Sequence, residues 1–321
     1  MELHQLRILR ELGDLGSVNA VAKALYVSPS AVSQHLAALQ RGFDAPLTRK
    51  EGRSLVLTTQ GQLLATAAAA VASTLAEATS KIHAHEQAVD TPIRVAGFHS
   101  IGQTIFAPLL TTSDGQLPPL RFFDEDVSQQ DFPSLTSSYD LVLAHRMPHT
   151  APWPSDRVSV VPLAFEPLDI ALHRDHPLAR FEKLTPAQVI DEPWVVSKGG
   201  YSPADVLETI AALAGSAPQV EHRVNDYATA GALVQASNCL GILPRFTARK
   251  SLDDSVTLRP IHGLNSGRQI DLLVRAEHLH RRPINEVIHA IRRTVRRLVG
   301  TEHTREGTAS SHAFPGPPTD A

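Results

Sequence analysis

The stretch VSPSAVSQHLAALQ, from Val27 to Gln40, decides the fold of the N-terminal part of the chain. Ser28 is a residue type that caps helix N-termini. Pro29 follows at the first turn, where its missing N–H costs no hydrogen bond. The apolar residues that follow recur at helical spacing and predict one buried stripe, formed by Val32, Leu36 and Leu39.

The opposite face of this predicted helix is polar. Its outward residues are Ser30, Ser33, Gln34 and Ala37, with His35 at the flank. Serine, glutamine and histidine can hydrogen-bond base edges or phosphates, and alanine can touch a thymine methyl group. For this helix taken alone, the solvated face of an ordinary three-helix bundle is the alternative.

The segments on either side favour a DNA-binding function. Two shorter helices precede the stretch: one over residues 3–12, and one capped by Ser17 over residues 18–25, joined to it by a very short turn. Such a pair is typical of a helix-turn-helix. TRKEGRSLVLTT (residues 48–59) then predicts a hairpin around Gly52, a wing with basic side chains. The predicted DNA-contacting residues are Ser28, Ser30, Ser33, Gln34, His35, Arg49, Lys50 and Arg53.

A long helix is predicted from a cap at Thr58 to about Gln87. At 1.5 Å per residue it would be about 45 Å long. Its apolar positions approximate a three-four alternation, which predicts pairing with a second copy: Leu64, Ala67, Val71, Ala78 and Ile82. Packing on the chain's own domains is the alternative.

From VDTPIRVAG (residues 89–97) onward, strand and helix patterns alternate. Such alternation predicts α/β units with a mostly parallel sheet, and its length suits two lobes. The predicted strands are 93–96, 120–123, 141–144, 158–163, 169–173, 194–197, 219–223, 240–243, 256–260 and 269–275. The predicted helices are 101–110, 134–138, 186–190, 203–214, 227–236 and 282–299.

Composition narrows the class of protein. A chain of 321 residues suggests two or three domains, and a net charge of −3 counts only weakly against a nucleic-acid partner. The single cysteine, Cys239, excludes an intramolecular disulfide. The N-terminus has no apolar segment typical of a signal peptide, and no apolar run approaches 18 residues. These features predict a cytoplasmic protein without a membrane span.

The combined motifs resemble the DNA-binding domain of LysR-type transcriptional regulators. The matching residues are Ser17, Leu25, Val27, Ser28, Ala31, Val32, Ser33, Arg49, Leu57, Thr58 and Gly61. The resemblance continues in DHPLARFEKLTPAQVIDEPWV and LGILPRF. Four positions depart from the family pattern, and two of them, Asp44 and Thr48, put the turn into the wing in doubt; the others are Val21 and Gln40.

The resemblance implies an α/β protein overall. It would comprise a winged helix-turn-helix (1–58), a linker and dimerisation helix (59–90), and a periplasmic-binding-protein-like effector domain (91–300). In that domain, lobe 1 is about 91–162 and 266–300, and lobe 2 is about 163–265. The tail 301–321 is rich in Pro, Gly and Ser and is predicted to be disordered. The implied partners are double-stranded DNA with a dyad-symmetric operator, a small-molecule effector, and further copies in a homodimer or homotetramer.

The effector is expected between the lobes, at strand ends and helix N-termini. The predicted ligand residues are His99, Ser100, Ile101, Glu125, Ser128, Ser197, Gly199, Asn225 and Asp226. Simple caps, turns and a solvated acidic loop are the alternatives for the last six. The effector is expected to be an amino acid or organic acid. If the acidic residues 124–126 face the cleft, a cation such as a basic amino acid fits instead.

No catalytic motif, phosphate-binding loop or metal-ligand spacing occurs in the sequence. The sequence therefore predicts no enzyme, no cofactor and no metal, and Cys239 is expected to be a buried, inert thiol. The alternative function is an α/β binding module or enzyme that carries an incidental N-terminal helical bundle.

Overall fold

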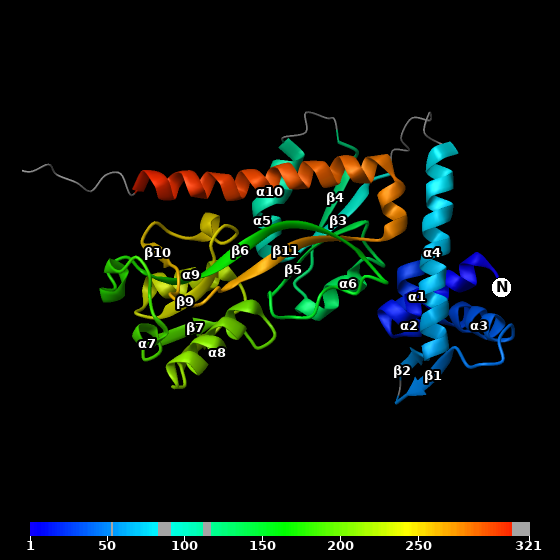
Figure 1. The fold of residues 1–321 in the computed structure, drawn as a ribbon, viewed down its shortest axis with the longest axis horizontal. Helices are drawn as coiled ribbons and strands as arrows, with labels where there is room; N and C mark the ends of the chain where they lie inside the picture. Colours follow the sequence, from blue (N-terminus) through cyan, green and yellow to red (C-terminus); the bar gives the residue numbers. More distant parts are fainter. Residues whose placement is uncertain (53, 83–90, 112–116, 310–321) are drawn as a thin grey trace, which may run out of the picture.

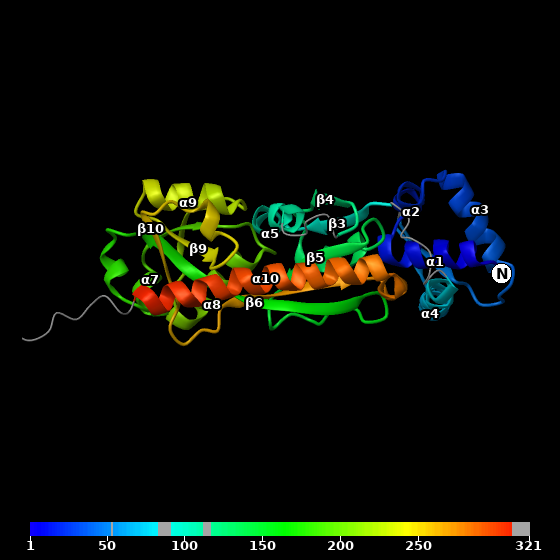
Figure 2. The ribbon, with the colours of Figure 1, turned by 90° about the horizontal axis from the view of Figure 1, so that it is seen from above.

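The computed structural model describes residues 1–52, 54–82, 91–111 and 117–309. The molecule is elongated, with the N-terminal domain (residues 1–58, called the head below) at one end and two α/β lobes beyond it (Figures 1 and 2).

The head contains three helices and a two-stranded wing: α1 (Leu3–Leu15), α2 (Val18–Leu25), α3 (Pro29–Gln40), β1 (Thr48–Glu51) and β2 (Ser54–Leu57). The predicted Ser28 cap is confirmed, because its Oγ accepts a hydrogen bond from the Ala31 N–H at 3.2 Å. Ser17 occupies the N-cap position of α2 but makes no side-chain capping bond. Tyr26 closes the turn between α2 and α3 in the left-handed region, at φ 56°.

Helix α4 (Thr59–Ile82) stands upright beside the head in Figure 1. The predicted cap is confirmed, because Thr58 Oγ1 accepts from the Gly61 N–H at 3.1 Å. The expected continuation to Gln87 lies outside the described residues. Contrary to the sequence expectation, α4 is long and apolar enough to cross a membrane, judged by length and composition only. Its many alanines explain the high mean hydropathy, and Ala65 and Ala68 are buried.

All ten predicted strands have a counterpart in the sheet of the effector domain. Its strands are β3 (Ile93–Gly97), β4 (Leu120–Asp124), β5 (Leu141–Arg146), β6 (Ser159–His173), β7 (Pro193–Val196), β8 (Gln219–Arg223), β9 (Leu240–Pro244), β10 (Val256–Arg259) and β11 (Gly267–Val274). The strand order is β4-β3-β5-β11-β6-β9-β7-β8, with β10 also paired to β6. Two predicted strands form the single 15-residue β6, which joins the lobes.

The expectation of a mostly parallel sheet is wrong. Strands β3, β4 and β5 pair in parallel, as do β7, β8 and β9. The pairs that involve β6 or β11 are antiparallel. The reason is that these two strands pass between the lobes instead of following a βαβ crossover.

The helices of the effector domain also follow the predicted positions: α5 (His99–Thr111), α6 (Phe132–Leu135), α7 (Pro186–Val189), α8 (Ser202–Ala214), α9 (Tyr227–Ala236) and α10 (Arg282–Ala309). Helix α10 extends past the predicted end at residue 299, so the expectation of a disordered tail from residue 301 is wrong up to Ala309. Residues 300–309 contain no proline, and their two glycines are Gly300 and Gly307. The rest of that tail, 310–321, lies outside the described residues.

Candidate functional site

The outward face of α3 is open to solvent, as a groove-reading helix requires. Ser30, Ser33 and Gln34 are exposed. Two serines also have partners within the helix: Ser28 Oγ lies 2.9 Å from Ser30 Oγ, and Ser33 Oγ donates to the Pro29 carbonyl at 3.0 Å. The amide of Gln34 makes no side-chain hydrogen bond within the part of the chain that the structure describes, so it is available to a base edge.

His35 lies at the edge of this face and is half-buried. Its Nδ1 lies 3.0 Å from Nε2 of His4, and the two rings meet edge to face at 4.4 Å. This contact positions the ring between α1 and α3.

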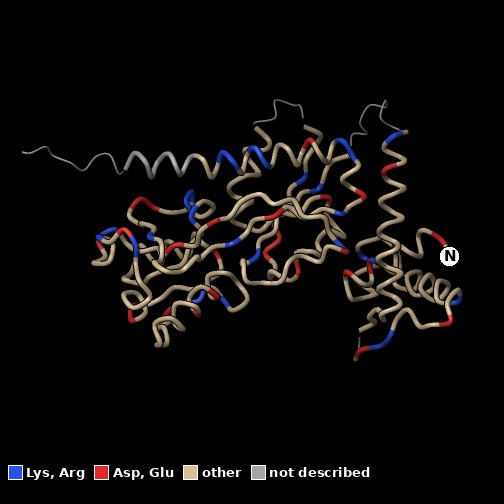
Figure 3. The backbone as a smooth tube through the Cα atoms, viewed as in Figure 1, with Lys and Arg blue, Asp and Glu red and all other residues tan. Residues whose placement is uncertain are grey.

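The wing carries the positive charge that α3 lacks. In Figure 3 the tube of α3 is free of charged residues, whereas β1 carries two basic residues, in blue, and one acidic residue, in red. Arg49 and Lys50 are exposed, and Arg49 Nη2 lies 3.4 Å from the Glu51 carboxylate. Arg53, the third predicted contact, lies outside the described residues.

Gln40 organises the turn that leads into the wing. Its amide nitrogen donates to the carbonyls of Phe43 at 3.1 Å and Ala45 at 3.0 Å. Its amide oxygen accepts from the Leu47 N–H at 2.8 Å. This departure from the family pattern therefore has a structural role, which the sequence did not reveal.

Replacing Gln40 with glutamate is expected to destabilise the head by about 1–3 kcal/mol, because two donated hydrogen bonds become contacts between a carboxylate and carbonyls. Hydrogen exchange of the head amides measures the loss. Gln60→Glu, at an exposed position of α4, is the matched control. Equal exchange in both variants would contradict this role for Gln40.

A buried ion pair occupies the centre of the junction between the lobes. Glu166 on β6 and Arg268 on β11 are register partners, 0% and 1% exposed. Arg268 Nη2 donates to Glu166 Oε2 at 2.8 Å. The other carboxylate oxygen accepts from the N–H groups of Phe246 at 2.9 Å and Thr247 at 2.6 Å. The pair thus has the additional hydrogen bonds that a buried charge needs.

The same arginine links lobe 1 to lobe 2. Its Nη2 donates to Ser100 Oγ at 3.1 Å and to Thr247 Oγ1 at 2.9 Å, and its guanidinium lies 4.7 Å from the centre of the Phe98 ring. Burial, together with Arg268, lowers the pKa of His145 well below its usual value. The imidazole of His145 is therefore neutral at pH 7. Ser100, the residue expected to hold effector, is 3% exposed and bonded to this cluster.

Three carboxylates from the two lobes surround His99. Its Nδ1 lies 2.6 Å from Asp124 of lobe 1, and its Nε2 lies 3.6 Å from Asp226 of lobe 2. The hydrogen bond to Asp124 raises the pKa of His99; burial opposes this rise, and the charges of Asp124, Asp226 and Asp126 reinforce it. Burial and the charge of Asp124 raise the pKa of Asp126.

The pKa of Asp226 is lowered, in contrast to that of Asp126. Asp226 caps α9 by accepting from the Thr229 N–H at 2.8 Å, which is the alternative that the sequence left open for this residue. Burial opposes its ionisation, but the Thr229 side chain and N–H and the charge of His99 outweigh burial and lower its pKa.

Other predicted ligand residues have local structural partners. Ile101 lies in the core of lobe 1, and its N–H donates to the Phe98 carbonyl at 3.1 Å. Glu125 accepts from the Tyr139 hydroxyl, and Ser128 donates to Asp131.

In lobe 2, Ser197 is 3% exposed and accepts from the Ala204 N–H at 3.2 Å. Asn225 accepts from the Lys198 N–H at 3.0 Å. Gly199 is exposed. These contacts form the loop that faces lobe 1.

Cys239 is buried, as predicted, at 2% exposure. Burial, with a further contribution from Glu221, raises the pKa of the thiol, which keeps it protonated at pH 7. One ligand atom each of Glu221, His222 and Cys239 lies within 4.8 Å of the others, although the first two side chains are exposed.

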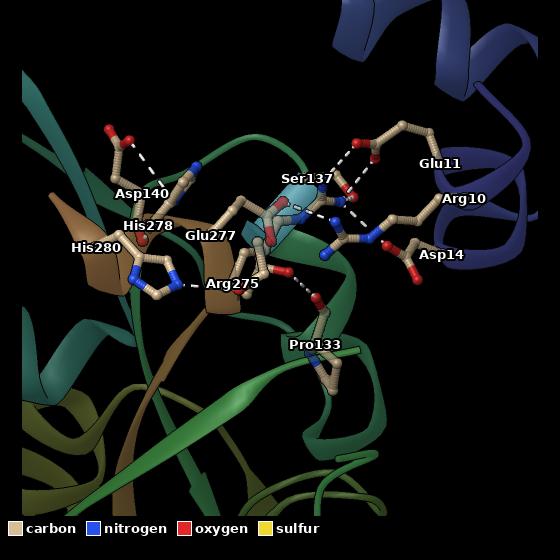
Figure 4. Close-up of polar contacts among 12 residues, drawn as sticks. Arg10, Glu11, Asp14, Pro133, Ser137, Asp140, Arg275, Glu277, His278 and His280 are labelled. Atoms are coloured by element: carbon tan, nitrogen blue, oxygen red, sulfur yellow. Dashed lines mark hydrogen bonds and ion pairs between the residues drawn. The ribbon is translucent and has the colours of Figure 1, made fainter. Parts of the chain in front are cut away.

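A second charged network joins the head to lobe 1 (Figure 4). Arg275, at the end of β11, donates two hydrogen bonds to the Glu11 carboxylate of α1, at 2.5 and 2.8 Å. It also bonds Asp14 at 3.1 Å. Arg10 of α1 donates to Glu277 at 2.7 Å. We call these five residues the head–lobe network.

Most side chains of the head–lobe network are buried from solvent. Arg10, Glu11 and Arg275 are 6%, 0% and 5% exposed. Burial raises the pKa of Asp14; Arg275 opposes the rise, and the Glu11 charge adds to it. Nothing in the sequence pointed to this network, because Glu11 and Arg275 are 264 residues apart.

Comparison with known proteins agrees with both halves of the structure. Residues 3–62 match the model of bacterial regulatory helix-turn-helix proteins of the lysR family, and residues 86–296 match the LysR substrate binding domain. The alternative function required the N-terminal helical bundle to be incidental, and its match to a helix-turn-helix family contradicts that.

Individual relatives are distant. The uncharacterised HTH-type transcriptional regulator YybE of Bacillus subtilis is 25% identical over 79% of this chain and 85% of its own. CysL, an HTH-type transcriptional regulator from the same organism, is 23% identical over 72% of this chain and 76% of its own. A full-length OxyR variant from Pseudomonas aeruginosa has the same fold, with a TM-score of 0.64 and 18% identity over 92% of this chain and 95% of that one. The chain belongs to the LysR family of DNA-binding transcriptional regulators, with an N-terminal helix-turn-helix and a C-terminal effector-binding domain.

Proposed function

We propose that this regulator reads a dyad-symmetric operator through α3 and the wing of two paired heads. The exposed, charge-free face of α3 beside a basic wing supports this proposal. Gln34 and the serines would contact bases, whereas Arg49 and Lys50 would neutralise phosphates. Because the α3 side chains are small, DNA shape would contribute to operator choice.

Pairing of the heads would use the unpartnered face of α4. Val71 and Ile82 are 43% and 74% exposed, and Ala67 and Ala78 are exposed too. These four residues share one side of the helix, whereas Leu64, at the start of the predicted stripe, packs against the head core. A second copy of α4 would bury this stripe and give a homodimer, from which a homotetramer would assemble. If a second copy covers the apolar stripe of α4, the helix needs no membrane around it, which is consistent with a regulator that acts in the cytoplasm.

A gel shift on the chain's own upstream region tests DNA reading. Lys50→Gln is expected to weaken binding to operator and competitor DNA alike and to lower the salt dependence. Gln34→Ala is expected to weaken operator binding by about 1–3 kcal/mol and leave competitor binding unchanged. Equal losses on both DNAs for Gln34→Ala would contradict base reading by α3.

We also propose that the effector carries a protonated amine, as a basic amino acid does, and that the chain catalyses no reaction on it. The carboxylates of Asp124, Asp126 and Asp226 crowd around His99 from both lobes and favour a cation. An amine that binds these groups would draw the lobes together, which would shift the spacing of the heads only if it binds one state better.

Binding of lysine is expected to strengthen as the pH rises. The pKa of His99 is raised. Below that pKa, protonated His99 competes with the ligand amine for the carboxylates, and above it neutral His99 no longer does. At still lower pH, protonation of Asp126 would remove one negative charge from the ligand site. Calorimetry with lysine from about pH 6 to about pH 9 measures this dependence. Glutamate is the control ligand, and tighter binding of glutamate than of lysine would overturn the amine proposal.

A further inference from the structure

A cavity of about 470 Å³ lies between α1, α4 and lobe 1, beside the head–lobe network. Its volume is within the range of small-molecule sites. None of the cleft residues around His99 or Arg268 lines it, so it is separate from the effector site proposed above.

The charges that line this cavity are unbalanced. Two of its four arginines, Arg10 and Arg275, have carboxylate partners in the head–lobe network. The other two, Arg7 of α1 and Arg94 of β3, have no carboxylate partner among the described residues. The lining carboxylates do not compensate: Glu277 is paired with Arg10, and Asp140 with an arginine outside the cavity at 2.9 Å. An anion would restore the balance.

Arg94 is held in position to receive such an anion. Its guanidinium lies 5.2 Å from the centre of the Phe123 ring and 5.1 Å from that of Tyr139. Stacking on two rings leaves the N–H edges of a guanidinium free to bind a carboxylate or sulfonate.

Two buried polar atoms of the lining also lack partners within the described part of the chain, Nε of Arg275 and Oε2 of Glu277. Both residues belong to the cavity wall. A buried donor left unpaired costs free energy, and an anion could accept from the Arg275 N–H, whereas the Glu277 oxygen needs a donor and does not itself favour an anion.

The opposite wall is apolar. Leu6 and Ala68 of the wall are buried, but Leu3 and Leu75 are 55% and 52% exposed. A ligand body that covers these leucines would be favoured by the hydrophobic effect. The wall therefore selects an anion that also carries an apolar group.

We propose that this head cavity is a second ligand site, which takes a small organic anion with an apolar body. The anionic group binds Arg7 and Arg94, and the apolar body lies on Leu6 and Leu75. Because Arg7 belongs to the head and Arg94 to lobe 1, the bound anion holds the head against its own effector domain.

The test uses the full-length protein and the fluorescent aromatic sulfonate 1-anilinonaphthalene-8-sulfonate, followed by calorimetry. Benzenesulfonate is expected to displace the probe, whereas benzylamine of similar size is not. Arg7→Gln and Arg94→Gln are each expected to weaken binding about tenfold. Arg293→Gln, at an exposed position of α10, makes the same charge change and is expected to have no effect.

Affinities within twofold of the unmodified protein in both variants would overturn the proposal. Equal displacement by benzylamine would do so too. If a segment of a second copy fills the cavity, probe binding falls as protein concentration rises, which also overturns it. Lysine is expected to leave the probe bound, so a failure here is distinct from a failure of the amine-effector proposal.

Discussion

Replacing Arg268 with methionine is expected to destabilise the effector domain by about 3–5 kcal/mol, because the Glu166 carboxylate then stays buried without its counter-charge. Methionine fills most of the volume, so loss of packing contributes little. Both tryptophans, Trp153 and Trp194, lie in the lobes and are at most 9% exposed. Their fluorescence during urea unfolding therefore reports on this domain and not on the head.

The double variant Glu166→Gln with Arg268→Met separates charge burial from packing. It removes both charges, so we expect it to recover much of the lost stability. Arg293→Met serves as the surface control. If the double variant were as unstable as Arg268→Met alone, the loss would come from packing and not from the unpaired carboxylate.

The same ion pair constrains how the effector acts. Arg268 holds Ser100 of lobe 1 and Thr247 of lobe 2 in one hydrogen-bonded cluster. A ligand that reaches Ser100 must therefore break or rearrange this cluster. The free energy of that rearrangement contributes to the difference in ligand affinity between the two conformational states. Effector control requires such a difference.

Regular patterns explain what the sequence predicted well. Helical spacing in Val32, Leu36 and Leu39 identified α3, and the alternation of strands and helices located every strand of the sheet. These features depend on local periodicity, which survives without tertiary information.

The site was less predictable because its chemistry depends on register. Glu166 and Arg268 lie in largely apolar strands that each hold one further buried charge, Asp169 in β6 and Asp271 in β11, and a buried charge needs a partner. Only the pairing of β6 with β11 makes them neighbours. Asp44 and Thr48 likewise cast doubt on the turn into the wing, whereas Gln40 secures it through contacts that no periodicity shows.

Replacing Arg275 with methionine is expected to release the head from lobe 1. The buried carboxylates of Glu11 and Asp14 would lose their counter-charge, a cost of about 3–5 kcal/mol if they stayed buried. Undocking returns them to water, so the head should separate while both domains stay folded. Hydrogen exchange should rise in α1 and in residues 275–280, with the tryptophan unfolding curve unchanged.

The release has a consequence for regulation. While docked, α1 and lobe 1 move as one body, so a change in lobe closure reaches α3 through Arg275 and Glu11. In Arg275→Met, operator affinity should no longer depend on a ligand in the cleft, although the ligand still binds. Arg157→Met, which removes only a longer and more exposed contact with Asp14 at 3.5 Å, is the matched control and should keep the dependence. If Arg275→Met kept both the exchange protection and the ligand dependence, coupling would have to pass through α4 alone.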